Sequence, residues 1–404
     1  MAERRSPLYD YHLRHAGRLV KGGGEYMFPV SYTSPQDEHI NVRTNVGMQD
    51  LSSMGEIDVK GPGAERLINR LLVNDILGME PGQLRYSTMC DEDGYVVDDI
   101  TVYKFNDEHF MIVTSSGPRA QTYHWVSEHA LGTSTYVTDI STGIALPVVQ
   151  GPRSRDLLQS VLDEGDVERL RFFRFTPARV NGVNVILSRS GYTGELGYEL
   201  YTPADEVAGL WEFLLAQGRD FGLQPYGVVA MNSLRVEKAL PLYGKDIHLE
   251  VTPFHVGLDR WIRFDKREFN GRDALLRWQD TGIDTRWVGL VLESKTPVNV
   301  DDPVYSVADI APFRSKRFSG PEAGELADAE TPGELVGNVT VRVHGHSFNK
   351  VLAMAYVRTT HAWPGAKLVI MSAGRPIVAT VTQTPFFDPA GARIRAKYGD
   401  APKR

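Results

Sequence analysis

The chain has 404 residues, of which 44 are Lys or Arg and 51 are Asp or Glu, and its formal net charge is −7. A hydrophobic content of 42% and a charged content of 24% are typical of globular proteins and exclude a disordered chain. The length predicts two to four domains, and the negative charge without a basic block argues against general nucleic-acid binding.

Membrane and metal chemistry find little support in the sequence. No stretch reaches the roughly 18 consecutive apolar residues of a membrane span, and the first residues contain no apolar segment of a secretion signal. The single cysteine, Cys90, excludes an internal disulfide and a cysteine-rich zinc site. The histidines form no HExxH motif, and His344 and His346 are the only close pair. We therefore expect a cytoplasmic enzyme without a metal site.

The first two thirds of the chain predict a mixture of helices and strands. Lys21-Gly-Gly-Gly24 predicts a flexible turn, and the apolar spacing of residues 63–72 predicts an amphipathic helix. Asp93-Gly94 is a hairpin signal between two strands. The strands expected in this part are 84–90, 95–105, 109–115, 183–190 and 197–201, and the further helices are 153–163, one that begins after Pro203, and 227–239.

The pattern changes after residue 286. Alternating or continuous apolar runs predict strands at 287–292, 339–343, 351–357, 367–371 and 377–384. The polar, Pro- and Gly-containing stretch of residues 298–335 is too long for an ordinary loop and is interpreted as an irregular insertion. The sequence therefore predicts a β-rich, barrel-like C-terminal domain.

One predicted strand contains two adjacent carboxylates, Asp98 and Asp99. Because side chains alternate between the faces of a strand, Asp98 shares a face with Val96 and Ile100, whereas Asp99 shares the other face with Tyr103. A carboxylate on the more apolar face is costly to bury without a partner. Asp98 therefore has either a functional role or backbone N–H partners near the turn, and the strand pattern leaves both open.

The segment from Gly191 to Glu199 contains three glycines at intervals of three. It lies between predicted strands and is not a dinucleotide fingerprint, which requires a strand followed by a helix. One interpretation is a tight turn with exposed carboxylates. The other is that Glu195 and Glu199 edge a pocket, where a carboxylate accepts two parallel hydrogen bonds from an amidine-like ligand edge.

Taken together, these segments resemble the aminomethyltransferase (glycine-cleavage T-protein) superfamily, which includes tetrahydrofolate-dependent demethylases and the folate domains of sarcosine and dimethylglycine dehydrogenases. The resemblance runs in matching order from about Pro7 to about residue 290 and more weakly to about 390. The segments that support it are 43–50, 94–99, 149–152, 191–199, 234–237, 243–244 and 269–275. Each segment is weak alone, but seven in the right order are a strong signal.

The resemblance implies an α+β fold with three domains in a ring around a central cavity that holds folate. We expect residues 1–55 and 140–225 to form a first α+β, folate-binding domain. Residues 56–139 and 226–285 would form a second α+β domain, and residues 286–404 the β-rich C-terminal domain.

The same resemblance implies which residues contact tetrahydrofolate. Asp98, the first of the Asp-Asp pair, would be the acid/base or electrostatic residue near the folate N5, and this implication favours the functional interpretation of its strand position. Glu199 would hold the pterin edge. The other residues transferred to the folate site are Tyr86, Val113, Thr114, Tyr192, Glu195 and Trp261.

Two departures from the family pattern concern the second substrate. Glycine-cleavage enzymes have a histidine where this chain has Ser53, and Arg-Asp where it has Met231-Asn232. Losing an arginine removes a planar five-donor group. We therefore expect Ser53 and Met231 to bind a different one-carbon donor.

These observations predict a tetrahydrofolate-dependent demethylase that moves a methyl group from a small N-, O- or S-methylated metabolite to N5 of tetrahydrofolate. The first alternative is a glycine-cleavage aminomethyltransferase, which produces 5,10-methylenetetrahydrofolate and needs a lipoylated carrier protein as its partner. The second alternative is a non-catalytic folate-binding scaffold like the iron–sulfur assembly proteins of this fold. Those proteins have a Lys-Gly-Cys signature, whereas Cys90 follows a methionine.

Overall fold

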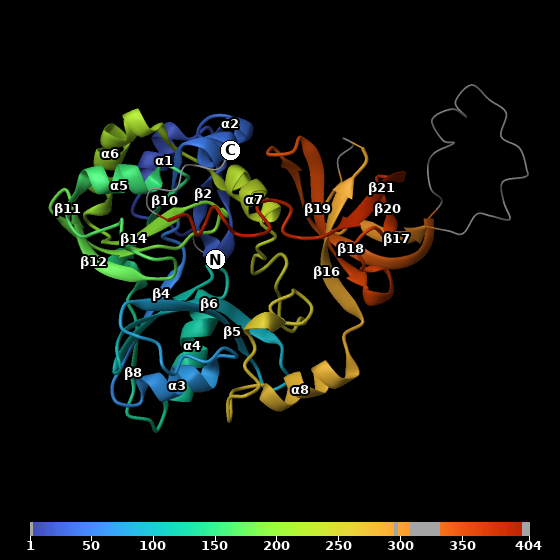
Figure 1. Ribbon diagram of the computed structural model, residues 1–404, viewed down its shortest axis with the longest axis horizontal. Helices are drawn as coiled ribbons and strands as arrows, with labels where there is room; N and C mark the ends of the chain where they lie inside the picture. The colour runs from blue at the N-terminus through green and yellow to red at the C-terminus, as the bar shows by residue number, and fades with distance from the viewer. Residues whose placement is uncertain (1–2, 295–297, 308–331, 398–404) are drawn as a thin grey trace, which may run out of the picture.

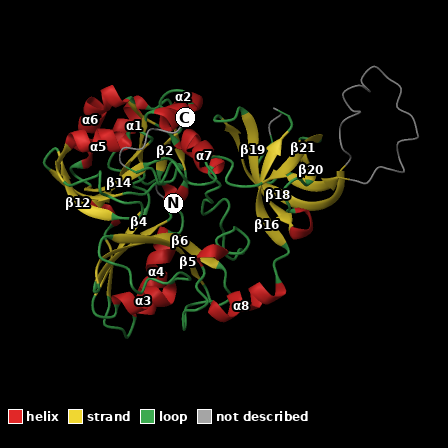
Figure 2. Cartoon of the chain, viewed as in Figure 1, coloured by secondary structure: helices red, strands yellow, loops and turns green. Residues whose placement is uncertain are grey.

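The computed structural model describes residues 3–294, 298–307 and 332–397. Figures 1 and 2 show two sheets with their helices on one side of the molecule and a barrel on the other. Helix α7 and the chain that follows it lie between these parts (Figure 1). Within the described residues, no helix is long and apolar enough to cross a membrane.

The first sheet has eight strands, and β14 and β10 lie at its middle. The helices α1, α5 and α6 cover one face through an apolar cluster around Leu157, Leu210 and Trp211. The strands are β3 (Val46–Asp50), β9 (Ile144–Ala145), β10 (Pro147–Gln150), β11 (Leu162–Glu164), β12 (Phe175–Val180), β13 (Val183–Ser188), β14 (Gly197–Pro203) and β15 (Leu223–Pro225). The helices of this part are α1 (Tyr9–His15), α2 (Pro35–Thr44), α5 (Ser154–Val161) and α6 (Val207–Gln217), and β1 (Leu19–Lys21) pairs with β2 (Met27–Pro29).

The second sheet has five strands in the order β5-β6-β7-β4-β8. Helices α3 and α4 cover one of its faces, where Ile57, Ile100 and Val126 share an apolar cluster. Its elements are β4 (Gly55–Lys60), α3 (Ala64–Leu71), β5 (Gln83–Cys90), β6 (Val96–Asn106), β7 (His109–Thr114), α4 (Arg119–Ala130) and β8 (Tyr136–Asp139). The predicted helix and three strands of this region are therefore confirmed.

The C-terminal strands form a closed six-stranded barrel in the order β16-β19-β18-β17-β20-β21. The strands are β16 (Thr285–Leu292), β17 (Pro303–Val307), β18 (Pro332–Gly345), β19 (Lys350–Arg358), β20 (Lys367–Ser372) and β21 (Arg375–Thr382). The expectation that residues 298–335 are an irregular insertion is wrong in part. β17 lies within it and closes the barrel, because it pairs with both β18 and β20. Residues 308–331 of that stretch lie outside the described residues.

The chain between the second half of the first sheet and the barrel contains α7 (Val228–Glu237), a short 3-10 helix η4 (Asp259–Trp261) and α8 (Arg272–Thr281). Asp246 joins this connection to the barrel. Its carboxylate is fully buried and accepts hydrogen bonds from the Thr340 hydroxyl and from Trp287 Nε1 (3.1 Å). It also pairs with the fully buried Arg235 of α7. The domain bounds expected from the sequence stay a prediction.

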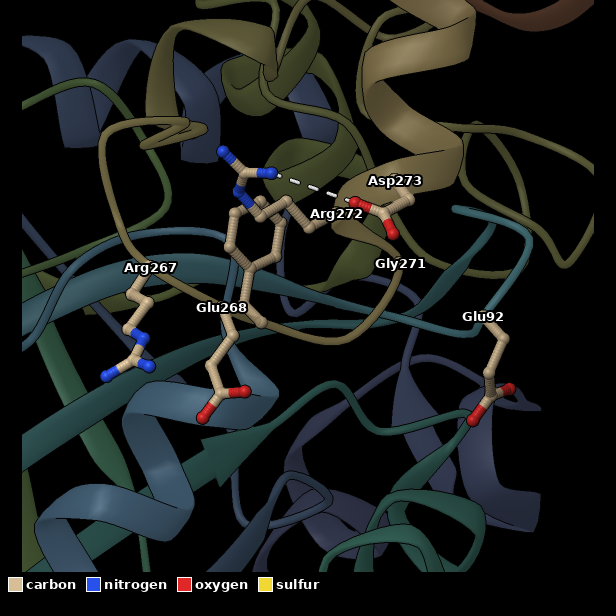
Figure 3. Close-up of a pocket in the computed structure, with 7 residues that line it drawn as sticks. Glu92, Arg267, Glu268, Gly271, Arg272 and Asp273 are labelled. Carbon is tan, nitrogen blue, oxygen red and sulfur yellow. Dashed lines mark ion pairs between the residues drawn. The ribbon is translucent and has the colours of Figure 1, made fainter.

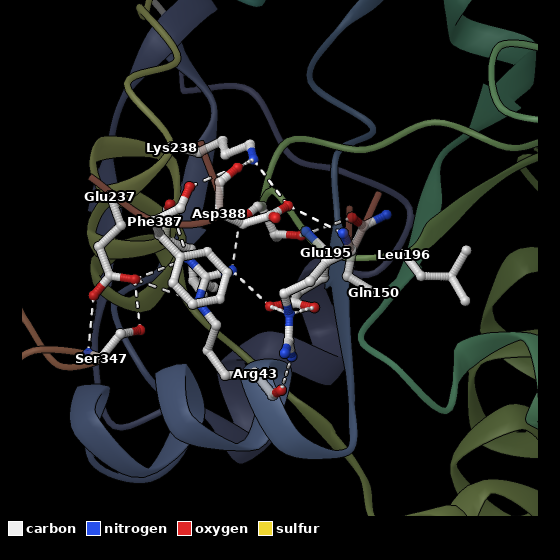
Figure 4. A network of polar contacts seen from close by, with 12 residues as sticks. Arg43, Gln150, Glu195, Leu196, Glu237, Lys238, Ser347, Phe387 and Asp388 are labelled. Carbon is white, nitrogen blue, oxygen red and sulfur yellow. Dashed lines mark hydrogen bonds and ion pairs between the residues drawn. The ribbon is translucent and has the colours of Figure 1, made fainter. Parts of the chain in front are cut away.

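A buried group of four charged residues, which we call the clamp, ties the barrel to the first sheet (Figure 4). Arg43 of α2 binds Glu237 of α7 (Nη2 to Oε2, 2.9 Å) and Glu195 (Nη1 to Oε1, 3.1 Å). Arg393, from the segment that leaves the barrel, binds the other oxygen of Glu195 at 2.7 Å. Each carboxylate therefore has a guanidinium partner, as buried charges require.

The segment after the barrel returns to the first sheet and completes this arrangement. In Figure 1 it crosses the molecule from the barrel past α7. The Phe387 ring covers the Arg43 guanidinium at 3.9 Å, which is a cation–π distance. Further along, Arg155 and Arg189 donate to the carbonyl of Ala396 at 2.7 and 2.6 Å. Four elements that are distant in the sequence thus meet at one ion cluster.

Glu237 is the clamp residue with the strongest predicted dependence on pH. Burial opposes its ionisation, but hydrogen bonds from His39 and Ser347 and the charge of Arg43 outweigh burial and lower the pKa of Glu237 to about 2. A carboxyl pKa that is lower in the folded than in the unfolded chain stabilises the folded state above the unfolded pKa. This stabilisation is lost as the pH falls through the folded pKa.

We therefore expect Glu237→Gln to lose a pH-dependent part of the stability. Between about pH 5 and about pH 2, the free energy of unfolding of the unaltered protein should fall by on the order of 3 kcal/mol more than that of the variant. Urea unfolding at a series of pH values measures this difference. The exposed Glu206→Gln is the matched control and should follow the unaltered protein. Parallel pH curves for Glu237→Gln and the unaltered protein would contradict the expectation.

Candidate functional site

The two sheets pack against each other on the faces that their helices leave free. Tyr103 and Val113 from the second sheet share an apolar cluster with Val148 and Tyr201 from the first. Several side chains in this interior are only half-buried, among them Tyr86, Asp99 and Glu199. Solvent therefore reaches polar groups in the middle of two sheets, which is the setting expected for a ligand site.

A β-bulge determines which way the two adjacent aspartates of β6 point. Cys90 of β5 pairs with Val96 and Met89 with Asp98, so Val97 is an extra residue in β6. The expected face pattern is therefore wrong at Val96, which packs in a different apolar cluster from Ile100. Beyond the bulge the alternation is regular, and Asp98 lies on the helix-covered face whereas Asp99 lies on the face that meets the first sheet.

Asp98 is fully buried beneath helix α4. Its Oδ2 accepts a hydrogen bond from the Thr122 hydroxyl of α4 (2.7 Å) and from the Ser115 backbone N–H (3.3 Å). Its Oδ1 has no hydrogen-bond partner among the described residues. Burial and the adjacent charge of Asp99 raise the pKa of Asp98 well above its usual range. Asp98 is thus on the apolar face, as expected, but that face does not open toward the other sheet.

Asp99 is half-buried and lies between two hydroxyl groups on the intersheet face. The Tyr86 hydroxyl donates to Oδ2 at 3.0 Å, and the Ser115 hydroxyl donates to Oδ1 at 3.0 Å. Burial raises the pKa of Asp99, and these two hydrogen bonds oppose the shift. A carboxylate with a raised pKa that solvent reaches is suited to accept and release a proton.

Aromatic side chains from three other segments surround Asp99. Trp261 of η4 packs edge-on against Tyr86, with ring centroids 6.0 Å apart, and its buried indole Nε1 has no hydrogen-bond partner in the part of the chain that the structure describes. The Tyr192 hydroxyl donates to the carbonyl of Pro241 at 2.5 Å. Burial, followed by the charges of Asp98 and Asp99, raises the pKa of Tyr243 to about 12. These rings provide flat apolar surfaces beside the carboxylate.

Glu199 faces the same region from the first sheet. Its Oε2 accepts hydrogen bonds from the hydroxyls of Tyr103 (2.9 Å) and Tyr201 (3.1 Å). Burial raises the pKa of Glu199, and the tyrosine hydroxyls oppose the rise. Because Tyr103 lies four residues after Asp99 on the same strand face, Glu199 and Asp99 belong to one site. We call the residues Tyr86, Asp99, Tyr192, Glu199 and Trp261 the central site.

Three other residues expected to contact ligands have mainly structural contacts. Thr114 is fully buried and donates its hydroxyl to the Ser115 carbonyl (3.0 Å) while accepting from Gly55 N–H (3.1 Å). Glu195 is a clamp residue bound by two guanidinium groups. Met231 packs against an apolar cluster of α2 and α7. Each of these side chains is used in packing or ion pairing, and its expected contact with a ligand stays a prediction.

Val113 and Ser53 lie closer to the expected place. Val113 pairs with Thr101 in β6 and belongs to the intersheet cluster, so it can line the central site. Ser53 is buried, and its hydroxyl lies 2.8 Å from that of Ser116, next to Ser115. Residues that were not predicted from the sequence but lie in or beside the central site are Asp99, Tyr103, Tyr201, Ser115, Ser116 and Tyr243. The period-two spacing of Asp99 and Tyr103 is the signal that could have identified the first two.

The chemistry of the central site fits a reduced pterin. The pterin edge offers N–H donors, and the carboxylate of Glu199 can accept them. Its partners in the protein are tyrosine hydroxyls and not cations. Tyr86 and Trp261 provide aromatic faces, and the buried indole N–H of Trp261 still lacks an acceptor. Asp99 would lie near the reacting nitrogen. These residues together can hold the ring system of tetrahydrofolate.

A separate pocket of about 320 Å³ lies near the start of α8 (Figure 3). It is lined by residues of both charges, and Arg272 and Asp273 are 3.7 Å apart. None of the central-site residues lines it. Gly271 in this pocket has a φ of +76°, and a side chain there would collide with the Asp91 carbonyl. The segment 269–275 is therefore explained by the turn into α8 rather than by ligand binding.

Comparison with known proteins identifies the family of the chain. A family model described as the GCVT N-terminal domain matches residues 8–266, and one described as the glycine cleavage T-protein C-terminal barrel domain matches residues 286–388. The aminomethyltransferase of Halothermothrix orenii is 33% identical over 383 residues, which are 95% of this chain and 99% of that protein. The aminomethyltransferase of Moorella thermoacetica is 34% identical over 384 residues, covering 95% and 98%.

A solved structure matches over the same length. The glycine cleavage system aminomethyltransferase T from Bartonella henselae superposes with a TM-score of 0.83 at 25% identity, covering 96% of this chain and 99% of that chain. These matches confirm the family and the mixed α+β fold with a closed C-terminal barrel. The chain belongs to the aminomethyltransferase (glycine-cleavage T-protein) family and is a tetrahydrofolate-dependent one-carbon transferase.

Proposed function

We propose that this protein transfers an aminomethyl carbon to tetrahydrofolate, as a glycine-cleavage aminomethyltransferase does. The observation that supports this best is the match over 95% of the chain to proteins named aminomethyltransferase. It favours the first alternative over the predicted demethylase. The donor would be an aminomethyl group bound to the lipoyl arm of a carrier protein, and the product would be 5,10-methylenetetrahydrofolate.

The residues of the central site divide the work between binding and proton transfer. Tetrahydrofolate, when bound, supplies the nucleophilic amine N5. Glu199 accepts hydrogen bonds from the pterin edge and thereby fixes its orientation. Alignment of the reacting groups contributes about 7–11 kcal/mol in favourable cases. Tyr86 and Trp261 restrict the ring plane and exclude water from it.

Asp99, rather than Asp98, is the acid/base residue in this proposal. Its raised pKa allows it to accept the proton that the amine releases and to stabilise the positive charge that develops there. Tyr86 and Ser115 hold its two oxygens in place. Asp98 acts from the opposite face, where it fixes the Ser115 backbone N–H and Thr122. Asp98 is therefore a positioning residue.

A demethylase remains the second candidate because of one observation. Ser53 is buried near Asp99's partner Ser115, and it has a small neutral side chain where glycine-cleavage enzymes have histidine. Because serine is smaller than histidine, the space beside Ser53 would admit a different one-carbon donor.

The donor is determined by incubating the purified protein with tetrahydrofolate and resolving the folate products by mass. We expect 5,10-methylenetetrahydrofolate with aminomethyl-loaded lipoyl carrier protein. We expect no 5-methyltetrahydrofolate with glycine betaine, dimethylglycine, sarcosine, dimethylsulfoniopropionate or methoxylated aromatics. Formation of 5-methyltetrahydrofolate with one of these donors would instead establish the demethylase.

Asp99→Asn and Asp98→Asn should differ in their effect on turnover. Removing a general acid or base lowers kcat by about 10²–10⁴-fold, which we expect for Asp99→Asn. Asp98→Asn should change kcat far less, because burial already favours the neutral acid and asparagine has the same shape. Steady-state kinetics of both variants, with folate affinity measured in parallel, compare them. A larger loss with Asp98→Asn would return the acid/base role to Asp98.

Glu199→Gln should weaken binding of tetrahydrofolate more than it changes the stability of the protein. A charged hydrogen bond contributes about 1.5–3 kcal/mol, so the dissociation constant should rise roughly tenfold to hundredfold. Quenching of tryptophan fluorescence by tetrahydrofolate measures this constant. The exposed Glu206→Gln is the control. Unchanged affinity in Glu199→Gln would remove Glu199 from the pterin site.

A further inference from the structure

Ser53 and Ser116 form a hydroxyl pair beside the central site. We propose that this pair donates a hydrogen bond to the heteroatom of the one-carbon donor from which the carbon is released. The inference rests on the proposed function and specifies how its second substrate is bound. Under that function the heteroatom is the thiol sulfur of the lipoyl arm.

The position of the pair follows from its connection to Asp99. Ser116 directly follows Ser115, whose hydroxyl binds Asp99 at 3.0 Å. Gly117 comes next, and a side chain there would lie 3.7 Å from the Tyr243 ring. Ser53 reaches the same turn from the chain between β3 and β4, at 2.8 Å from Ser116. The pair is therefore attached to the segment that positions the proposed acid/base residue.

The hydrogen-bonding capacity of the two serines is not exhausted by their mutual contact. Each hydroxyl has one O–H donor and two acceptor lone pairs. In the 2.8 Å contact between the two oxygens, one hydroxyl donates and the other accepts. The second hydroxyl hydrogen has no other contact recorded among the described residues. It is available to a ligand atom that has a lone pair.

A glycine turn near the N-terminus packs against this pair. A side chain at Gly23 would approach Ser116 Cβ to 3.2 Å, and one at Gly24 would reach the Ser116 carbonyl oxygen at 2.5 Å. Gly24 has a φ of +66°, which glycine adopts without strain. The segment expected to be a flexible turn is thus a close-fitting cover over Ser116. This packing fixes the position of Ser116 within the pair.

The charged residue nearest in sequence to Ser116 has its own partners away from the hydroxyl pair. Arg119, at the start of α4, donates to the Tyr26 hydroxyl at 3.0 Å and lies 3.5 Å from Asp139. The hydrogen-bond donors beside Ser53 and Ser116 are therefore hydroxyls and not cations. A neutral hydroxyl suits a leaving atom that ends as a neutral thiol or amine. In a histidine-containing relative, a ring N–H would occupy the position of Ser53.

The transfer step balances without any added oxidant or reductant. The bond between carbon and the donor heteroatom breaks, and its electron pair stays on the heteroatom. The new bond forms between carbon and the folate nitrogen, which loses a proton to Asp99. That proton is returned to the heteroatom, which leaves as S–H in the aminomethyl reaction or as N–H with an N-methyl donor. In the aminomethyl reaction N10 of the folate then bonds to the same carbon, the carbon–nitrogen bond of the aminomethyl group breaks, and its nitrogen takes up the N10 proton and leaves as ammonia. A serine hydroxyl stabilises the electron pair while the bond breaks.

Ser53→Ala and Ser116→Ala test the role of the pair. We expect each variant to lower the single-turnover transfer rate by about tenfold to hundredfold. The double variant should be no slower than the slower single variant, because the two hydroxyls act as a unit. The dissociation constant for tetrahydrofolate should stay unchanged. Ser160→Ala, which removes the hydroxyl that an exposed serine donates to the Leu157 carbonyl of α5, is the control.

A binding measurement separates this inference from the proposed function. Dihydrolipoamide is titrated calorimetrically into the protein–tetrahydrofolate complex, and we expect its affinity to fall at least threefold in Ser53→Ala and Ser116→Ala. If the unaltered protein transfers no carbon but the variants still lose this affinity, the proposed function fails and the binding role of the pair stands. Equal affinity in the variants and the unaltered protein, whatever the transfer rates, would overturn the inference.

The glycine cover gives a second test that leaves both hydroxyls in place. Gly23→Ala should displace Ser116 and lower the transfer rate several-fold with unchanged folate affinity. Gly17→Ala is its control, because nothing lies within 4 Å of the added methyl group. A Gly23→Ala protein that transfers carbon at the unaltered rate would argue against a close-fitting cover.

Discussion

The clamp is the interaction on which the relative placement of the other parts depends. Arg43 and Arg393 neutralise Glu195 and Glu237 inside the protein, and they come from α2 and from the segment that follows the barrel. Removing one partner of such a buried pair leaves an uncompensated charge, which typically costs 3–5 kcal/mol. Separating the barrel, α7 and the first sheet would therefore expose these charges or leave them buried without a partner. The clamp also holds the chain between α7 and α8, which contains Trp261 of the central site and the neighbouring Tyr243.

The carboxylates of the central site have neutral partners instead of arginines. Asp99 and Glu199 are held by the hydroxyls of Tyr86, Ser115, Tyr103 and Tyr201 instead of by guanidinium groups. Hydroxyls keep a carboxylate in place but compensate burial less than a full positive charge does, so both pKa values stay above their usual range. Such carboxyls hold a proton more readily than exposed ones, and their oxygens can accept hydrogen bonds from a neutral ring. The clamp gives stability, and the central site keeps its carboxyls available for a ligand.

The two positions that depart from the family pattern have different meanings in three dimensions. Met231 is part of an apolar cluster between α2 and α7, so its replacement of an arginine changes packing at that place. Ser53 instead lies beside Ser116 at the edge of the central site, where a change of side chain alters what the donor meets. The sequence treats these departures alike. Only the contacts show that Met231 lies at a helix interface and that Ser53 lies beside the central site.

Much of the local structure was determined by the sequence alone. Periodicity and turn residues identified the strands around Asp98, the helices 154–161 and 228–237 and most of the barrel, because these signals are local. The order of weak motifs identified the family. β17 was missed because a five-residue strand inside a long polar stretch has little periodic signal. Its strand conformation depends on pairing with β18 and β20.

The site itself required the tertiary structure. Alternation correctly separated Asp98 from Asp99, but a sequence does not say which face of a strand is covered by helices and which meets another sheet. Glu195 and Glu199 are four residues apart and look equivalent in the sequence, yet one is bound by two arginines and the other by two tyrosines. Their partners come from remote segments. The sequence thus determined the residue types and their strand positions, whereas long-range packing decided which carboxylate stabilises the fold and which one remains free for chemistry.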